Sequence, residues 1–462
     1  MIRIEGGDMV GQQMLRAVLG PLRQKYGLME CDVPVDPKFE LGGILEKLGN
    51  AQPVLFKKVK GHTMPVIGGM FGDRNMFYDL IGTNRKERFG KILGAMTNPM
   101  EPTVVSDGPV HENVITSRID LGKLLPLPTF HELDSSSFIT AGVLALRDPD
   151  TGKMVTSIRR FQFNGGNNLS ALITSPLLSE QVKKCREQKK NLEVAVILGY
   201  DHIFCLASQI SSSLYGIDKY AFDSALRGEP LELVKCKTVD LEVPAQAELV
   251  LEGIIPWNEL KTEGPFGELM GYYGSVAEHP VMLVQCVTHR NDCIFQISAP
   301  CREEHLSNGL IRDVELYSHV NRLVEVVDAN ITIGGGCRFH GIVSIKKKGE
   351  GDGKTAILGA LSSSKDLKHV VIVDDDVDIF DPMDVEHALA ARVQASKDVV
   401  IIPGGMGTGL DPSHLLNMTT DKVGIDATKP LGPMAPKFAK ALIPGYDSIE
   451  LARYFPGYAR KG

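Results

Sequence analysis

The chain has 462 residues, of which 43% are hydrophobic and 23% charged, and its formal net charge is −7. This length fits roughly two to four domains. The negative charge argues against a nucleic-acid-binding surface, and no apolar run reaches the roughly 20 residues that a membrane span needs. The first eight residues lack the charged and then apolar pattern of a secretory signal. We therefore expect a soluble cytoplasmic enzyme that binds neither nucleic acid nor membrane.

The cysteines indicate the same compartment. No two of them form a C-x-x-C pair, and most lie inside apolar stretches. This is typical of reduced, buried thiols in an intracellular protein rather than of disulfides or a zinc site. Their positions are Cys31, Cys185, Cys205, Cys236, Cys286, Cys293, Cys301 and Cys337.

The first hundred residues predict a small α/β unit. Its expected elements, in order, are a helix over 8–28, a helix over 37–50, a strand at 54–56, a strand within 64–73 and a helix over 74–97. Segment 98–102 contains two prolines and is a candidate linker. We predict an N-terminal α/β region over residues 1–112.

From about residue 113 the pattern changes to strands. We expect strands at 138–146, 154–158, 192–200, 233–252 and 281–299, with one helix over 177–189. Segment 147–153 is rich in Asp, Pro and Gly and indicates a hairpin turn. A β-rich region with few helices suggests a barrel-like domain, which we place at 113–308.

The last third alternates between helix and strand. A helix over 309–325 is followed by a strand at 369–373, a helix over 383–394 and a strand at 399–403. This alternation predicts βαβ units and a mostly parallel sheet in a third domain, residues 309–462. The fold class is therefore α/β, or α+β when the central region is included.

Segment 262–268 holds two carboxylates, two glycines and a proline. It is no helix interior, because Pro265 lacks an N–H and the glycines raise the entropy cost, and it is no ordinary central strand. We predict a shaped loop that presents Glu263, Phe266 and Glu268. Two carboxylates on a rigid loop fit acid–base chemistry, and a surface turn with solvated acids is the alternative.

Arg159 and Arg160 stand near the end of a predicted strand. An arginine there can hold a carboxylate or phosphate through two parallel hydrogen bonds. Strand alternation places the two side chains on opposite faces, so at most one faces a given site. The alternative is one solvated arginine and one structural ion pair.

Two further segments carry weaker signals. The glycine-rich segment 404–409 lacks the lysine and hydroxyl of a phosphate-binding loop, and we expect a flexible loop there. The acidic run 374–378 has the ligand type for Mg²⁺, but solvated acids at a strand end are the simpler interpretation.

Several motifs together resemble the UbiD family of prenylated-FMN-dependent decarboxylases and carboxylases. Glu263-Gly-Pro-Phe-Gly-Glu268 and Ser157-Ile158-x-Arg160 carry the resemblance, supported in order by segments 225–230, 243–253, 373–378 and 424–428. It covers nearly the whole length. It implies an N-terminal α/β region, a central split-barrel flavin-binding domain and a C-terminal α/β dimerisation domain with a dimerisation tail.

The resemblance also implies roles for particular residues. Arg160 would orient the substrate carboxylate and the flavin, Glu268 would donate the proton after CO₂ leaves, and Glu263 would hold Arg160. The cofactor-binding residues that it implies are Ser157, Ile158, Arg160, Ala207, Ser208, Gln209 and Lys219.

The chain departs from the family at the expected metal site. Members usually bind the cofactor phosphate through a divalent metal (Mn or Mg) and K⁺. The divalent-metal ligand positions fall on Val155, near Pro176 and Leu177, and on Lys219. Valine and leucine cannot ligate a hard cation, whereas a lysine brings its own charge to a phosphate. We predict that Lys219 replaces the divalent metal; the alternative is a changed or lost cofactor function.

The resemblance predicts a carboxy-lyase that acts on a small aromatic, heteroaromatic or α,β-unsaturated carboxylic acid, in either direction. One alternative is a decarboxylase of a phosphorylated enoic acid in the archaeal mevalonate route. Another is a non-catalytic subunit of a multi-subunit carboxylase. A UbiX-type flavin prenyltransferase would supply the cofactor, and the expected assembly is a homodimer or a hexamer.

Overall fold

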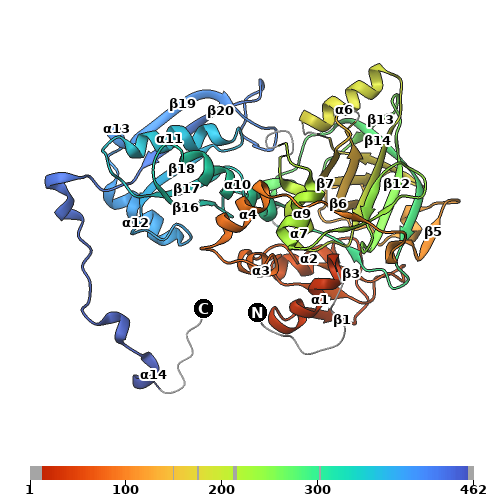
Figure 1. Cartoon of the computed structure of the whole chain (residues 1–462), viewed down its shortest axis with the longest axis horizontal. Helices are drawn as coiled ribbons and strands as arrows, with labels where there is room; N and C mark the ends of the chain where they lie inside the picture. The colour runs from red at the N-terminus through yellow and green to blue at the C-terminus, as the bar shows by residue number, and fades with distance from the viewer. Residues whose placement is uncertain (1–12, 149, 174–175, 212–215, 301–302, 456–462) are drawn as a thin grey trace.

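A computed structural model describes residues 13–148, 150–173, 176–211, 216–300 and 303–455. Figure 1 shows a curved β-sheet body with the N-terminal helices below it and a second, separate sheet with its own helices beside them. Among the described residues, no helix has the length and apolar character of a membrane span. The mixed α/β class expected from the sequence is confirmed.

The N-terminal segment forms a small α/β layer. Its elements are α1 (Met14–Lys25), β1 (Met29–Cys31), α2 (Glu40–Lys47), β2 (Val54–Phe56), β3 (Val66–Gly68), α3 (Arg74–Leu80) and α4 (Arg88–Thr97). A late strand, β15 (Phe295–Gln296), completes its sheet in the order β1-β2-β3-β15. The single helix predicted over 74–97 is wrong. Gly82, with a φ of +71°, follows α3 in the left-handed conformation that ends helices, and α4 begins afresh.

The central strands close into a ring. The strands are β6 (Phe138–Arg147), β7 (Met154–Phe163), β8 (Asn168–Ala171), β9 (Leu192–Leu198), β12 (Leu249–Ile255), β13 (Leu260–Glu263) and β14 (Ala277–His289). The sheet order is β12-β9-β6-β7-β8-β14-β13, and β12 also pairs with β14. That extra pairing closes six strands on themselves, as a barrel requires. The split-barrel assignment stays a prediction.

Smaller elements surround this ring. They are β4 (Thr103–Val104), η1 (Pro109–His111), β5 (Asn113–Ile115), α5 (Leu121–Leu124), α6 (Pro176–Glu187), α7 (His202–Gln209), α9 (Lys219–Arg227), β10 (Glu232–Lys235), β11 (Glu242–Pro244) and η2 (Leu269–Gly271). The stretch 233–252, in which strands were expected, contains β10, β11 and the start of β12; β10 and β11 pair with each other, and β12 belongs to the ring. Helix α7, which carries the candidate site residues 207–209, was not predicted.

The C-terminal segment forms a five-stranded sheet with helices on both faces. Its elements are α10 (Glu303–Val320), β16 (Val326–Ile331), β17 (His340–Ile345), α11 (Asp352–Ser363), β18 (His369–Asp374), α12 (Pro382–Arg392), α13 (Ala395–Asp398), β19 (Val399–Met406) and β20 (Thr419–Asp426). The order is β16-β17-β18-β20-β19. Only the β17–β18 and β18–β20 pairings are parallel, so the mostly parallel sheet predicted is wrong at both edges.

Two sequence expectations for this segment also change. Residues 404–406, predicted as part of a flexible loop, belong to β19 and pair with β20 beyond a bulge between Ile402 and Gly405. In the acidic run, Asp374 and Asp376 both accept hydrogen bonds from Arg392. These acids therefore have Arg392 as their cationic partner, and no Mg²⁺ ion is needed to neutralise them.

The chain after β20 extends away from the rest of the molecule. It contains η3 (Gly432–Phe438), η4 (Tyr446–Ser448) and α14 (Leu451–Tyr454), and Figure 1 shows α14 far from both sheets. Apolar side chains here are strongly exposed; Leu442 and Ile443 are 80% and 68% accessible. We call residues 429–455 the C-terminal tail.

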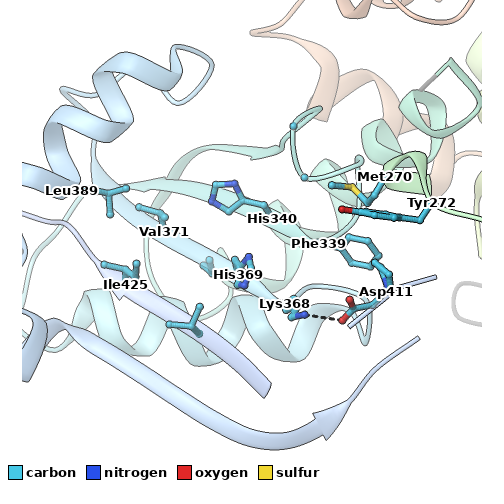
Figure 2. Close-up of a pocket in the computed structure, with 15 residues that line it drawn as sticks. Met270, Tyr272, Phe339, His340, Lys368, His369, Val371, Leu389, Asp411 and Ile425 are labelled. Carbon is cyan, nitrogen blue, oxygen red and sulfur yellow. Dashed lines mark hydrogen bonds and ion pairs between the residues drawn. The ribbon is translucent and has the colours of Figure 1, made fainter. Parts of the chain in front are cut away.

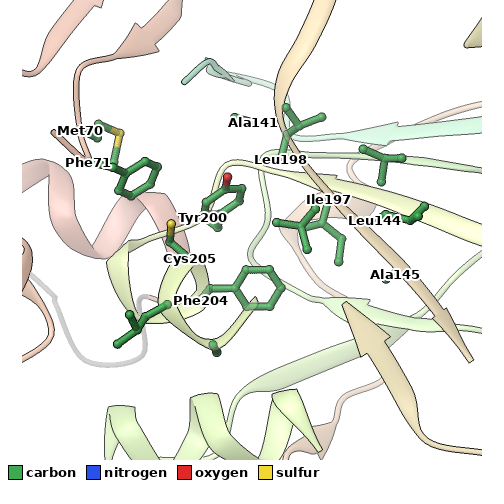
Figure 3. Packing of buried hydrophobic residues seen from close by; sticks show 14 of the residues in the cluster. Met70, Phe71, Ala141, Leu144, Ala145, Ile197, Leu198, Tyr200, Phe204 and Cys205 are labelled. Carbon is green, nitrogen blue, oxygen red and sulfur yellow. The ribbon is translucent and has the colours of Figure 1, made fainter. Parts of the chain in front are cut away.

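One continuous core joins the N-terminal layer to the barrel. Figure 3 shows Met70 and Phe71, from the loop after β3, beside Tyr200 and Phe204 next to the barrel strands. The rings of Phe71 and Tyr200 stack with their centroids 5.7 Å apart. Stacked aromatic rings of this size bury a large apolar area. This contact holds the chain just before α7 against the N-terminal layer.

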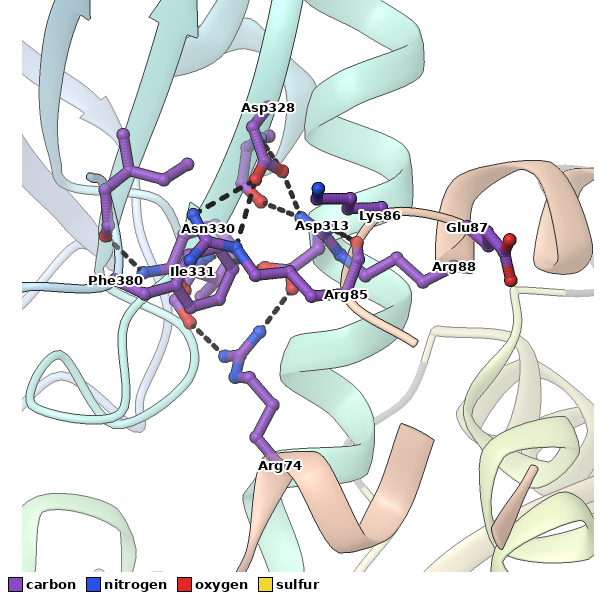
Figure 4. Close-up of polar contacts among 12 residues, drawn as sticks. Arg74, Arg85, Lys86, Glu87, Arg88, Asp313, Asp328, Asn330, Ile331 and Phe380 are labelled. Atoms are coloured by element: carbon purple, nitrogen blue, oxygen red, sulfur yellow. Dashed lines mark hydrogen bonds and ion pairs between the residues drawn. The ribbon is translucent and has the colours of Figure 1, made fainter. Parts of the chain in front are cut away.

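Buried arginines join the N-terminal layer to the C-terminal sheet (Figure 4). Arg74 on α3 pairs with Asp313 on α10 and donates to the carbonyl of Ile331 at 2.9 Å. Arg88 on α4 pairs with Asp328 and donates to the carbonyl of Ala329 at 2.7 Å. Both of these carbonyls lie on β16, so the edge of the C-terminal sheet is held by polar contacts of fixed geometry.

Candidate active site

Arg160, Glu263 and Glu268 meet at one point of the barrel. Arg160 projects from β7, Glu263 ends β13, and Glu268 lies on the loop that follows. The Nε and Nη2 atoms of Arg160 donate to the two carboxylate oxygens of Glu263 at 2.8 and 2.9 Å. Its Nη1 atom donates to Glu268. The guanidinium therefore holds one carboxylate with two bonds and the other with one.

Burial distinguishes the two acids. The side chain of Glu263 is fully buried and that of Arg160 is 5% exposed, whereas that of Glu268 is 16% exposed. The guanidinium carbon of Arg160 also lies 4.8 Å from the ring centroid of buried Phe266. Glu263 and Phe266 thus fix the arginine on the protein side, and Glu268 is the member of the set that a ligand can reach.

Glycines make the acid loop possible. Gly264 has a φ of +88°, a conformation that favours glycine. A Cβ on Gly267 would lie 2.2 Å from Nδ1 of His131, and a Cβ on Gly274 would lie 2.9 Å from Cγ of Glu268. The loop therefore packs too closely for larger residues at these positions, which explains why the sequence has glycines there.

Two residues that the sequence analysis missed hold this loop. Asp134 accepts hydrogen bonds from the backbone N–H of Gly267 at 2.9 Å and of His131 at 2.9 Å. Burial opposes its ionisation, but these hydrogen bonds and the nearby His131 hold the pKa of Asp134 below its usual value. The amide oxygen of Gln162 accepts from the backbone N–H of Gly264 at 2.9 Å.

A weak sequence signal existed for both residues. Gln162 is two residues from Arg160 in the same strand, so it shares a face with the arginine. Asp134 belongs to a polar run, 131–137, directly before an apolar strand. His279 on β14 was also missed; burial lowers its pKa, and the charges of Glu263 and Arg160 act on it in opposite directions.

The predicted cofactor-binding residues lie on two neighbouring elements. Ser157 and Ile158 are half-buried on β7, and residues 207–209 form the end of α7. Buried Lys219, the first residue of α9, joins them: its Nζ atom donates to the carbonyl of Thr156 at 2.6 Å and to that of Ser208 at 2.9 Å. Gln209 instead accepts a hydrogen bond from Asn308 at 3.2 Å.

The two adjacent arginines serve different places. Arg160 binds the two glutamates, whereas Arg159 lies close enough to Lys219 for its positive charge to lower the pKa of that lysine. This division agrees with strand alternation, which sends neighbouring side chains to opposite faces.

Two of the three positions that the resemblance assigns to divalent-metal ligands carry side chains that do not bind a hard cation. Val155 is buried and apolar, and Lys219 is a cation. The side chains of Pro176 and Leu177, the remaining predicted position, lie outside the described residues, as does Cys301. Among the residues that the structure describes, no group of three or more His, Cys, Asp or Glu side chains is placed to hold a metal ion.

A cavity of about 470 Å³ adjoins the acid loop (Figure 2). Met270 and Tyr272, which follow Glu268, form one wall, and residues of the C-terminal sheet form the other. The second wall includes Phe339, Val371, Leu389 and Ile425, with His340 and His369, and an ion pair between Lys368 and Asp411 of 2.9 Å. The lining is mainly apolar, and Arg160, Glu263 and Glu268 are not part of it.

Comparisons with known proteins agree along the chain. The models for the N-terminal, Rift-related and C-terminal domains of 3-octaprenyl-4-hydroxybenzoate carboxy-lyase match residues 19–96, 103–303 and 305–427. Anhydromevalonate phosphate decarboxylase of Methanothermobacter thermautotrophicus is 37% identical over 408 residues, which is 88% of this chain and 95% of that protein.

Solved structures match as well. The UbiD-class enzyme HmfF from Pelotomaculum thermopropionicum, in complex with FMN, has a TM-score of 0.93 and 42% identity, covering 96% of this chain and all of that one. An evolved dimeric form of HmfF, in complex with prenylated FMN, has a TM-score of 0.89 and 40% identity, with coverage of 96% and 100%. The chain therefore belongs to the UbiD family of decarboxylases.

Proposed function

We propose that this carboxy-lyase uses prenylated FMN to decarboxylate a phosphorylated α,β-unsaturated acid. The observation that carries the substrate is the 37% identity to anhydromevalonate phosphate decarboxylase over 88% of the chain. A phosphorylated unsaturated acid is therefore favoured as the substrate over the aromatic and heteroaromatic acids that the resemblance predicts. Reaction in the carboxylation direction stays a prediction.

The geometry supports distinct roles for the three charged residues. Arg160, fixed by two bonds to Glu263, has the planar fork that orients a carboxylate. Glu268 is the more accessible acid, and it donates a proton to the carbon from which CO₂ has left. Glu263 keeps Arg160 in place. When bound, the cofactor supplies an electron sink for the breaking carbon–carbon bond.

The nearby cavity fits the organic part of a small acid. Its volume of about 470 Å³ lies in the range of small-molecule sites, and its lining is mainly apolar. The Lys368–Asp411 pair and two histidines are the polar groups at its edge. A substrate reaching from Glu268 past Met270 would place its chain against Phe339 and its polar end near this edge.

A non-catalytic subunit is the alternative from a different class. Such a subunit has no need of a buried arginine held between two carboxylates, because desolvating these charges costs free energy. The complete Arg160, Glu263 and Glu268 set therefore favours an enzyme.

The substrate is tested with holoenzyme produced together with a UbiX-type flavin prenyltransferase. CO₂ release is followed for the phosphorylated enoic acid, for the same acid without its phosphate, and for 3,4-dihydroxybenzoic acid. We expect kcat/KM to be at least tenfold higher for the phosphorylated acid, a difference of about 1.4 kcal/mol. Turnover of the aromatic acid alone would contradict the substrate assignment while leaving the decarboxylase class intact.

We also propose that the C-terminal tail mediates a homodimer, or a dimer that builds a hexamer. Exposed apolar side chains such as Leu442, Ile443 and Tyr446 favour burial against another chain. Removing residues 429–462 should reduce the mass measured by light scattering to that of one chain. An unchanged mass would exclude the tail from assembly.

A further inference from the structure

Lys219 is an unusual residue in this protein. It is 6% exposed, although lysine is among the residues least often buried without a partner. Within the described part of the chain it forms no ion pair with a carboxylate. Its Nζ atom donates instead to two backbone carbonyls, those of Thr156 on β7 and Ser208 on α7.

This arrangement is a cradle for a cation. Backbone carbonyl oxygens are ligands that desolvated cations use in proteins, and here the ammonium group occupies the place between them. An ammonium has three N–H donors, and the two carbonyl bonds leave one for another acceptor. The cradle therefore presents a fixed positive charge with a spare donor.

The electrostatics of this position favour an anion beside Lys219. Burial, with the charge of Arg159 added to it, lowers the pKa of Lys219 to about 7. Such a site destabilises the charged lysine in the free protein. A phosphate beside Lys219 would raise its pKa again, because an anion favours the protonated form of the lysine.

The neighbouring residues are among those that the family resemblance assigns to cofactor binding. Lys219 joins Thr156, directly before Ser157 and Ile158, to Ser208 at the end of α7. Val155 in the same strand offers no metal ligand. We propose that the Lys219 ammonium is the resident cation of the cofactor phosphate site and takes the place of the divalent metal. The inference rests on the proposed function only in assuming a flavin cofactor.

The test measures binding rather than turnover. The full-length apoprotein, in buffer containing EDTA, is titrated with FMN and with riboflavin, which lacks the phosphate. For wild type we expect FMN to bind about 10- to 100-fold more tightly than riboflavin, the worth of one charge-assisted hydrogen bond. Lys219→Met should remove that difference without changing riboflavin affinity.

Lys153→Met is the matched control. Lys153 also donates to a backbone carbonyl, that of Gly216 at 3.1 Å, but it is exposed. FMN affinity of this variant should equal that of wild type. FMN binding by Lys219→Met that equals wild type would overturn the inference.

A second arm does not depend on the folding of a variant. Wild-type protein is titrated with FMN after EDTA treatment and again with Mn²⁺ added. We expect the same affinity in both conditions. Affinity that falls to the riboflavin value in EDTA and returns with Mn²⁺ would show a metal site and overturn the inference. Failure to decarboxylate the phosphorylated acid, with Lys219-dependent FMN binding intact, would count against the substrate proposal alone.

Discussion

Arg160 is the residue that joins the two carboxylates of the candidate active site. Its Nε and Nη2 atoms bind the fully buried Glu263, its Nη1 atom binds the partly exposed Glu268, and Phe266 covers its face. A guanidinium held in this way has little freedom to reorient, so its orientation is already fixed in the absence of substrate. In the proposed reaction, this preorganisation would let one charged group both position the substrate carboxylate and hold the acid assigned as proton donor.

Replacing Arg160 by lysine tests whether shape matters beyond charge. The ammonium of lysine cannot make two parallel bonds to Glu263 and a third bond to Glu268. We expect Arg160→Lys to lower kcat about 100-fold or more, since misplacement by about 1 Å can cost that much. Full activity in steady-state assays of this variant would show that charge alone suffices.

At the scale of elements, the acid loop depends on a distant segment. Asp134, before β6, and Gln162, on β7, accept hydrogen bonds from the loop backbone at Gly267 and Gly264. These contacts join parts of the chain that are 133 and 102 residues apart. The loop therefore takes its shape from its own glycines and its position from the barrel.

Asp134→Ala removes the acceptor for the Gly267 N–H. We expect kcat to fall about tenfold or more, because Glu268 is no longer held at the correct distance. FMN affinity should stay unchanged. Asp120→Ala is the control: Asp120 caps α5 and accepts from the backbone N–H of Lys123, away from the acid loop. Equal kcat values for the two variants would exclude Asp134 as a positioning residue.

The same elements show what sequence alone can predict. Pro265 and its flanking glycines exclude helix and strand locally, so the loop was predictable. Helix α7 was not, because nearly all its side chains are buried and it lacks a polar face. The parallel or antiparallel direction of edge strands β16 and β19 is also absent from local patterns, since it depends on which neighbour each strand meets.

The site set was predictable only in part for a similar reason. Arg160, Glu263 and Glu268 stand in motifs, whereas Asp134 and Gln162 act through bonds to backbone atoms that leave no fixed spacing. The sequence places Lys219 at a position where the family has a metal ligand. Its burial and its two carbonyl partners are properties of the folded chain alone.

At the scale of the whole molecule, buried arginines connect the N-terminal layer with the C-terminal sheet. Arg88 is 2% exposed at the side chain and pairs with Asp328, while Arg85 pairs with the same aspartate at 3.4 Å but is 39% exposed. The two arginines thus offer a buried and an exposed contact to one partner. The C-terminal sheet forms one wall of the cavity beside the acid loop, so its attachment affects the site.

Arg88→Met and Arg85→Met separate these contributions. Loss of the buried arginine removes the buried ion pair of Asp328 and the donor to the Ala329 carbonyl, and it leaves Asp328 to the exposed Arg85. We expect about 3 kcal/mol less stability to urea. Loss of the exposed arginine should cost within about 1 kcal/mol. Equal losses for the two variants would show that burial does not determine the strength of this connection.

Glu268→Gln is the most direct test of the proton-donor role proposed for Glu268. Glutamine keeps the size and one hydrogen-bond acceptor for Arg160, but it cannot donate the acidic proton. In holoenzyme assays of CO₂ release, we expect kcat to fall by about 10²- to 10⁴-fold, with FMN affinity within twofold of wild type. Turnover by Glu268→Gln at the wild-type rate would show that Glu268 is not the proton donor.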